Sequence, residues 1–268
     1  MAGAAAKIAV ALAGASNQEC LRKIERVASY ASTAEVRLDL METFDVVELV
    51  EQSPIPLVMT FRPAREGGKY VGDESTRLDV LHTAVDAGVA YVDVEVDALD
   101  AIARWRATDT LVMASHHDFE SVPNDLLQSY ENIRERCDIV KLVGTANTVA
   151  DSLAVFELLR SADTPVVTMA MGEAGRMTRV LAPYFSSCLF TYGAASEQDA
   201  TAPGQLSVQA MVDGLGLDKL NPSTSLQFRI GQEWGAAWVD DAVTFEVPAS
   251  DGIARTLTTA FPEATFCN

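Results

Sequence analysis

Short runs of apolar and β-branched residues recur along the chain at fairly even intervals. The eight clearest runs are residues 7–12, 35–40, 56–62, 90–96, 110–117, 138–143, 165–171 and 188–192. They are short for helices and are bounded by polar or turn-forming residues, as buried strands are. The pattern therefore predicts eight strands.

Segments with helical periodicity lie between these runs. The clearest are residues 18–30, 75–87, 124–136, 148–160 and 175–185. Asn124 is placed to cap the helix that follows it. Eight strands that alternate with helices, at about 26 residues per unit, are typical of an α/β fold of the closed (β/α)8 TIM barrel type. An open doubly wound sheet is the alternative, but the turn after the first run has no GxGxxG motif.

The barrel pattern is complete near Leu215, and residues 214–219 are expected to close the last helix. We therefore expect a catalytic barrel domain at residues 1–220 and a C-terminal extension at residues 221–268. Residues 242–247 of the extension alternate like a strand. The sequence assigns the extension no role: packing on the barrel, a subunit contact and loose order all fit.

The composition restricts the possible binding partners of the protein more than it restricts the possible folds. The net charge is −18, which argues against nucleic acid as a partner because phosphate binding needs basic patches. The acidic excess resembles proteins of high-salt cytoplasms. No apolar run reaches the roughly 18–20 residues of a membrane helix. The four cysteines are far apart and form no CxxC motif, so we expect no disulfide framework or zinc site, and a cytoplasmic location.

Charged residues alternate with apolar ones in several predicted strands. In a single strand this pattern can mark an edge that faces solvent, but a closed barrel has no edges. Inward charges have to be paired, and charges near strand ends indicate an active site at the C-terminal mouth of the barrel. The residues that share these polar faces are Glu35, Arg37 and Asp39 in the second strand and Asp93, Glu95 and Asp97 in the fourth.

Lys141 is the strongest single candidate for a catalytic residue. It lies between Ile139 and Val143 on a predicted central strand, where lysine is rare. Burial and neighbouring cations favour the neutral amine, which is the form that attacks a ketone. The alternative is a structural lysine that is ion-paired or extends to solvent.

His117 is the second candidate, at the end of the fifth strand with Ser115 on its side. A histidine beside a Schiff-base lysine can take and return a proton. Adjacent His116 should face the opposite way, so the two are not expected to share a metal. We expect His116 and His82 to be packed or loop histidines.

Two predicted loops carry further candidate site features. Residues 62–69 contain Gly67-Gly68, which permits a tight turn, and Glu66, which is placed to orient the histidine. Residues 193–205 form a long loop with glycine and proline that suits a lid over the mouth.

At these positions the sequence resembles the type I 3-dehydroquinate dehydratases of the shikimate pathway, and their archaeal members in particular. The resemblance covers roughly residues 7–216. The matching pieces, in family order, are Glu35-Val-Arg37-Leu-Asp39, Thr60-Phe-Arg62 with Glu66-Gly-Gly, Asp93-Val-Glu95, Ser115-His-His117-Asp-Phe119, Asp138-Ile-Val-Lys141, Met169-Ala-Met171-Gly172, Arg179 and Ala202-Pro-Gly-Gln205.

The resemblance implies a role for each residue. Lys141 forms an imine with the C3 ketone of 3-dehydroquinate, and His117, placed by Glu66, removes the C2 proton and protonates the leaving C1 hydroxyl in a syn elimination. It also implies that no metal or organic cofactor is needed. Substrate binding falls to Arg179 for the carboxylate, and to Glu35, Arg37, Arg62, Thr201 and Gln205.

Two positions depart from the family. Thr201 stands where serine is frequent, and Ala11 replaces a serine of the first strand, so one polar contact is missing. The extension lies outside the resemblance. A homodimer is the expected assembly on general grounds.

Two other functions remain open. A class I Schiff-base aldolase would share the barrel and the lysine but act on phosphorylated sugars, for which no Gly-rich phosphate loop follows strands seven and eight. A non-enzymatic barrel that binds the same ligand would not need both Lys141 and His117.

The acidic composition makes a prediction about salt. Molar KCl screens the mutual repulsion of the surface carboxylates. We therefore expect the Tm to rise by several degrees between low and molar KCl, as measured by thermal unfolding. No stabilisation at molar salt would count against the high-salt interpretation.

Overall fold

The eight apolar runs form the strands of one parallel sheet in the computed structural model, which describes residues 7–199 and 204–267. Their order is β7-β6-β5-β4-β3-β2-β1-β8. The strands are β1 (Ile8–Leu12), β2 (Thr33–Arg37), β3 (Leu57–Thr60), β4 (Tyr91–Glu95), β5 (Leu111–His117), β6 (Ile139–Thr145), β7 (Val166–Met171) and β8 (Thr191–Ala194).

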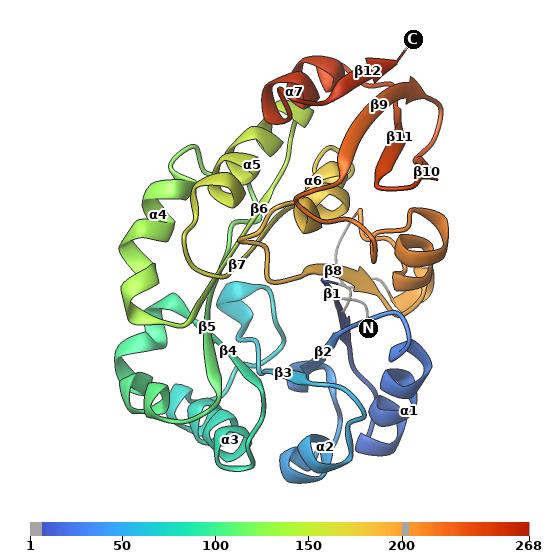
Figure 1. Cartoon of the computed structure of the whole chain (residues 1–268). Helices are drawn as coiled ribbons and strands as arrows, with labels where there is room; N and C mark the ends of the chain where they lie inside the picture. Colours follow the sequence, from blue (N-terminus) through green and yellow to red (C-terminus); the bar gives the residue numbers. More distant parts are fainter. Residues whose placement is uncertain (1–6, 200–203, 268) are drawn as a thin grey trace.

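The sheet closes into a barrel between β7 and β8. Val166 bridges Cys188 just before β8, and the Leu189 amide donates to the Val166 carbonyl at 3.0 Å. β8 then pairs with β1 from Thr191 onward. Figure 1 shows the strands in the centre and the helices outside them. The predicted (β/α)8 TIM barrel is therefore confirmed, although the regular part of the eighth strand begins later than the apolar run.

The connections between strands are mostly helical, and four of the five predicted helices are shorter than expected, whereas α3 has the predicted length. The α-helices are α1 (Asn17–Val27), α2 (Val46–Gln52), α3 (Glu74–Asp86), α4 (Leu126–Ile133), α5 (Ser152–Ser161) and α6 (Arg176–Leu181). A long 3-10 segment, η3 (Val96–Ala107), follows β4, and a π-helical segment, η8 (Ala210–Gly214), ends the connection after β8. The prediction that Asn124 caps α4 is wrong, because Asp125 occupies the N-cap position.

Short 3-10 turns complete the connections. They are η1 (Leu38–Leu40), η2 (Ala64–Glu66), η4 (Arg134–Arg136), η5 (Val149–Asp151), η6 (Ala182–Tyr184) and η7 (Glu197–Asp199). The turn η1 begins where the second strand was expected to continue to residue 40, so Asp39 lies beyond the strand rather than in it.

Two apolar cores follow from strand alternation. Outward residues such as Val36, Val94 and Leu142 pack against the helices, whereas Ile139, Val167 and Met169 fill the inside of the barrel. The charged residues of β2, β4 and β6 share the inner face with this second core. The charged side chains inside the barrel therefore lie beside an apolar inner core.

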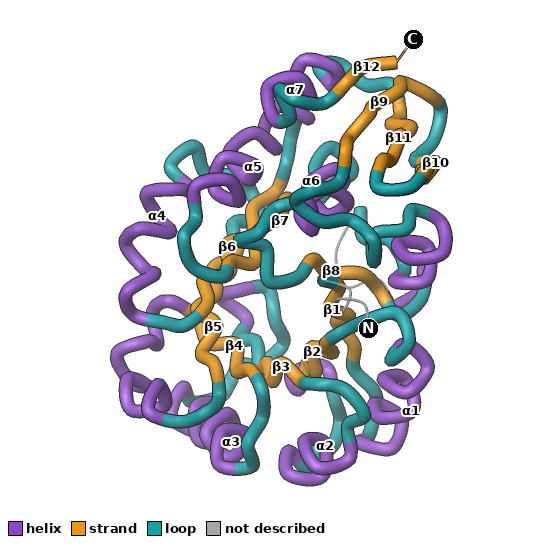
Figure 2. Tube along the Cα trace, viewed as in Figure 1, coloured by secondary structure: helices purple, strands orange, loops and turns teal. Residues whose placement is uncertain are grey.

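The C-terminal extension forms a second, four-stranded sheet in the order β10-β11-β9-β12. It contains β9 (Ser225–Gly231), β10 (Gly235–Val239), β11 (Ala242–Pro248), α7 (Ile253–Ala260) and β12 (Thr265–Cys267). β11 confirms the one strand that the sequence predicted. Figure 2 shows this sheet beside the barrel, near α5 and α6.

Phe261, which follows α7, joins the extension to the barrel. Its ring lies 5.1 Å from Phe156 of α5, 5.7 Å from Phe185 and 5.6 Å from Phe228 of β9, measured between centroids. Of the three possibilities left open by the sequence, packing on the barrel is the one observed.

This contact predicts a stability effect. Phe261→Ala removes a buried ring that contacts both β9 of the extension and the helical layer of the barrel, which costs about 3–5 kcal/mol in unfolding free energy. Val239→Ala, at a position that is 70% exposed, is the control and should change it by less than about 0.5 kcal/mol. Urea unfolding of both variants measures the difference, and equal small effects would show that Phe261 does not join the two parts.

Candidate active site

A pocket of about 110 Å³ lies at the C-terminal ends of the barrel strands. Eight of the nine predicted site residues line it, and the ninth, Thr201, lies outside the described residues. The full lining is Ala11, Glu35, Arg37, Arg62, Glu66, Gly67, His117, Phe119, Lys141, Val143, Met169, Met171, Arg179, Tyr192 and Gln205.

Lys141 points from β6 into this pocket and is 4% exposed. Its Nζ lies 3.0 Å from Glu35 Oε2 and 2.8 Å from Asp93 Oδ2. The sequence interpretation expected neighbouring cations, but the groups in contact with Nζ are carboxylates. Their negative charges offset the desolvation cost of a cation on this buried nitrogen.

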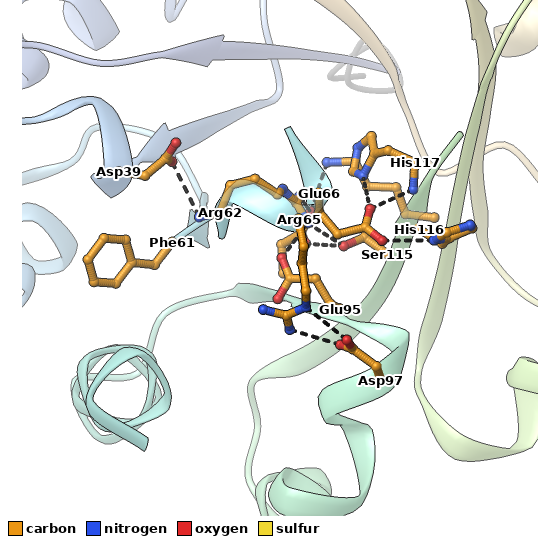
Figure 3. A network of polar contacts seen from close by, with 12 residues as sticks. Asp39, Phe61, Arg62, Arg65, Glu66, Glu95, Asp97, Ser115, His116 and His117 are labelled. Carbon is orange, nitrogen blue, oxygen red and sulfur yellow. Dashed lines mark hydrogen bonds and ion pairs between the residues drawn. The ribbon is translucent and has the colours of Figure 1, made fainter. Parts of the chain in front are cut away.

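The same carboxylates continue into a buried ion-pair network, part of which Figure 3 shows. Arg62 pairs with Asp93 at 2.8 Å and with Glu95 at 2.7 Å, and it donates to Ser115 Oγ at 2.6 Å. Arg77, which is fully buried, pairs with Glu95 at 2.6 Å. Each charge of this network therefore has an opposite charge in contact, which offsets its cost of desolvation.

The network lowers the pKa of Asp93 and Glu35, whereas burial outweighs the arginines at Glu95 and raises its pKa. Burial alone would raise the pKa of Asp93, but Arg62 and Lys141 outweigh it and hold that pKa well below its ordinary value. The pKa of Glu35 is lowered in the same way, chiefly by Lys141 against the effect of burial. Both groups are therefore anionic at neutral pH, where they can stabilise a cation that forms on Lys141.

Tyr192 is a site residue that sequence reasoning missed. Its hydroxyl lies 3.4 Å from Lys141 Nζ, and the ammonium is 4.7 Å from the centre of its ring. Burial, followed by Glu35 and Asp93, raises the pKa of this hydroxyl, which stays protonated. Strand parity was the available signal, because Phe190 and Tyr192 both belong to the inner core.

Asp39 is a second missed residue. Its carboxylate accepts two hydrogen bonds of 2.8 Å from Arg37, and it also accepts the amides of Arg62 at 3.3 Å and Lys69 at 3.1 Å. Asp39 thereby holds both ends of the 62–69 loop. The sequence placed Asp39 on the polar face of the second strand and in a family motif, but assigned it no role in the site.

That loop places Glu66 against His117. Glu66 Oε2 accepts the His117 amide at 2.8 Å and lies 3.2 Å from His117 Nδ1. Gly67 and Gly68 make the approach possible: a Cβ on Gly67 would lie 2.3 Å from the Phe119 ring, and one on Gly68 would lie 2.0 Å from the Arg62 carbonyl oxygen. The tight turn predicted at these glycines is confirmed, with a φ of 76° at Gly67.

His117 is held in its neutral form. Burial is the largest cause and Arg62 the next, and together they lower its pKa to about 4 against the opposing effect of Glu66. Glu66 itself keeps its charge: hydrogen bonds from His116 and His117 outweigh burial and lower its pKa to about 2. His117 is thus a base available over a wide pH range.

His116 differs from its expected role as a packed or loop residue. Its Nδ1 lies 2.8 Å from Glu66 Oε1, although its side chain is 54% exposed. Both histidines reach one carboxylate because they end β5, where the 62–69 loop lies across the strand end (Figure 3).

Arg179 on α6 is unlike the other buried arginines. It is 3% exposed, and its Nη1 lies 2.9 Å from Met169 Sδ and 3.5 Å from the Tyr192 carbonyl oxygen. Burial lowers its pKa to about 10. Within residues 7–199 and 204–267 no carboxylate forms an ion pair with it, so its guanidinium is suited to an anion supplied by a ligand.

Gln205 reaches the pocket from the loop after β8. Gly204 has a φ of 77°, and a Cβ there would lie 2.5 Å from the carbonyl oxygen of Gly172, at the end of β7. The two loops therefore approach closely through glycine, and Gln205 lines the pocket that Arg179 also lines.

Together these groups offer a primary amine, an imidazole base and an unpaired guanidinium in one pocket. A family model for type I 3-dehydroquinase matches residues 8–222. The chain belongs to the type I 3-dehydroquinase family. The 3-dehydroquinate dehydratase of Desulfotalea psychrophila is 34% identical over 220 residues, which are 76% of this chain and 95% of that protein.

Two further relatives in the family are also similar in sequence to this chain. The dehydratase of the methanogen Methanothrix thermoacetophila is 34% identical over 194 residues, covering 70% of this chain and 84% of that protein, which fits an archaeal-like sequence. A bifunctional 3-dehydroquinate dehydratase/shikimate dehydrogenase of Arabidopsis thaliana is 32% identical, and the matched region covers 75% of this chain but only 35% of that protein.

Solved structures support the fold. The type I 3-dehydroquinate dehydratase of Clostridium difficile superposes with a TM-score of 0.67 at 23% identity, covering 78% of this chain and 90% of that chain. The dehydroquinate dehydratase and shikimate dehydrogenase of S. pombe gives a TM-score of 0.66 at 19% identity, covering 98% of this chain and 56% of that chain.

The site predicts an unusual histidine titration. His117 should titrate near pH 4, well below the ordinary histidine value of about 6.5, because burial and Arg62 disfavour its cation. Imidazole NMR resonances followed against pH measure this value. The chain has three histidines, and His117→Gln identifies the signal by its loss. A His117 signal that titrates at or above the ordinary value would contradict the buried, cation-facing placement.

Proposed function

We propose that this chain dehydrates 3-dehydroquinate to 3-dehydroshikimate, a step of the shikimate pathway of aromatic amino-acid biosynthesis, through an imine on Lys141. The observation that carries the proposal is the placement of a buried lysine amine, a neutral histidine and an unpaired arginine around one small pocket of a type I 3-dehydroquinase. These three groups suit the dehydration of a carboxylated ketone through an imine: the lysine forms the imine, the histidine transfers the proton and the arginine binds the carboxylate.

Substrate binding begins with an ion pair. The substrate carboxylate pairs with Arg179, whose buried guanidinium gains the counter-ion that it lacks in the described part of the chain. This places the C3 ketone at Lys141. We propose that Glu35, Arg37, Thr201 and Gln205 bind the hydroxyls. Arg62 borders the pocket, but its contacts with Asp93, Glu95 and Ser115 suit it to hold the network in place.

Imine formation follows. The amine of Lys141, after giving up a proton, adds to the C3 carbonyl, and loss of water leaves a protonated imine. Glu35 and Asp93, both within 3.0 Å of Nζ, are placed to stabilise that cation. The iminium withdraws electrons from C2 and makes its proton acidic.

His117 then acts twice. Its Nδ1 faces Glu66, which leaves Nε2 for the substrate. The neutral imidazole takes the C2 proton, and the enamine that forms expels the C1 hydroxyl, to which His117 returns the proton so that water leaves. Hydrolysis of the imine releases the product and restores Lys141. No step requires a metal or organic cofactor.

A class I Schiff-base aldolase is the alternative reaction for a barrel lysine. It would break a C–C bond and release two carbonyl fragments, whereas dehydration gives one conjugated enone. Family membership and the buried Arg179 favour dehydration.

The location, partner and assembly of the enzyme are inferred from less specific features of the chain. No helix among residues 7–199 and 204–267 is long and apolar enough to span a membrane. A small molecule is the expected partner. We propose that the enzyme works in the cytoplasm as a homodimer, with the reaction confined to the barrel at residues 1–220 and no catalytic residue in the extension at 221–268.

Borohydride trapping tests the lysine. Reduction in the presence of 3-dehydroquinate should leave a stable adduct on Lys141, because borohydride reduces an imine to an amine, and peptide mass mapping locates it. Lys141→Met should lose at least about three orders of magnitude in kcat, as expected when a nucleophile is removed. Lys219→Met, a surface variant, is the control and should match the parent. No adduct, or an adduct on another lysine, overturns the mechanism.

A further inference from the structure

The carboxylate of Glu66 is shared between two adjacent histidines. Oε2 faces His117, with the amide at 2.8 Å and Nδ1 at 3.2 Å, whereas Oε1 lies 2.8 Å from Nδ1 of His116. Figure 3 shows the carboxylate between the two rings. Both oxygens are therefore engaged, and rotation of the carboxylate about its last bond would break contacts on both sides.

The two histidines differ in their access to water. His116 is 54% exposed, whereas His117 and Glu66 are 14% and 12% exposed. Protons from solvent therefore reach His116 directly, and Glu66 is the side chain that contacts both His116 and His117.

Their electrostatic surroundings also differ. A hydrogen bond with Glu66 raises the pKa of His116 against the effect of burial, and Asp118 at the end of β5 and Asp97 of η3 act in the same direction. Asp97 is itself paired with Arg65 at 2.8 Å. The charged groups that face His117 are Arg62, Lys141, Asp93 and Glu66.

We propose that His116 is a positioning residue for the dehydration, which acts on His117 through their shared partner Glu66. The proposal rests on the proposed function of this site. His116 does not line the pocket, so it has no part in binding the substrate.

Two effects follow from the geometry. The hydrogen bond from His116 fixes the carboxylate that orients the His117 ring, so it supports the proton transfers and hence kcat. The positive charge of protonated His116 offsets the negative charge of Glu66, so it disfavours the cation of His117 and keeps that residue a free base at lower pH.

Two substitutions separate these effects. Asparagine places an N–H donor at the same number of bonds from the backbone as Nδ1 of histidine, but it carries no charge. His116→Asn should therefore retain kcat within about twofold and raise the pKa of His117 by roughly one unit, the size expected for a nearby charge. His116→Ala loses the donor as well and should lower kcat about tenfold, with little change in KM.

The experiment combines NMR titration of His117 with the pH profile of kcat/KM for the parent and both variants. His82→Asn is the matched control, because His82 stacks on Trp105 away from the pocket, and it should change neither readout. Circular dichroism checks that the exposed substitutions leave the fold intact.

The outcomes are distinct. An unchanged His117 titration in His116→Asn together with an unchanged kcat in His116→Ala overturns the proposal. An acid limb of kcat/KM that moves with the NMR titration supports it. Because the NMR readout needs no substrate, failure of this coupling is distinguishable from failure of the proposed function, which would appear as a lack of product with the parent protein.

Discussion

The ion pairs of Lys141 with Glu35 and Asp93 are the contacts on which the rest of this site depends. A lysine that is 4% exposed is costly unless its charge is compensated, and here two carboxylates lie within 3.0 Å of Nζ. Those carboxylates need further cations, and Asp93 finds one in Arg62. The charge balance thus extends from the reactive amine through the barrel wall.

The closed barrel makes this balance possible. Glu35 comes from β2, Asp93 from β4 and Lys141 from β6, so alternate strands aim their side chains at one point inside the ring. In an open sheet the same residues would lie side by side along a surface and be solvated. Within the barrel, only opposite charges in contact can offset the loss of water.

Arg179 is the exception that gives the pocket its specificity. The buried Arg62 and Arg77 have carboxylate partners, whereas in the part of the chain that the structure describes Arg179 contacts only a thioether and a carbonyl oxygen. A ligand carboxylate would therefore restore an interaction that folding leaves open, and it would do so next to the amine that reacts. Binding of the carboxylate and reaction at the amine thus take place in the same pocket.

The sequence by itself determined the number of barrel strands, the inward charged faces of β2 and β4, and the residues that mark the family, because periodicity and motif spacing are local properties. It placed Lys141 and His117 correctly in the pocket lining. It did not determine that Nζ meets Glu35, 106 residues away, or that Tyr192 lies beneath it, since such contacts depend on how the barrel closes. It also predicted that His116 and His117 face opposite ways, and His117 lines the pocket whereas His116 does not. Only the tertiary structure decided that both rings contact one carboxylate, because the 62–69 loop carries Glu66 across the end of β5.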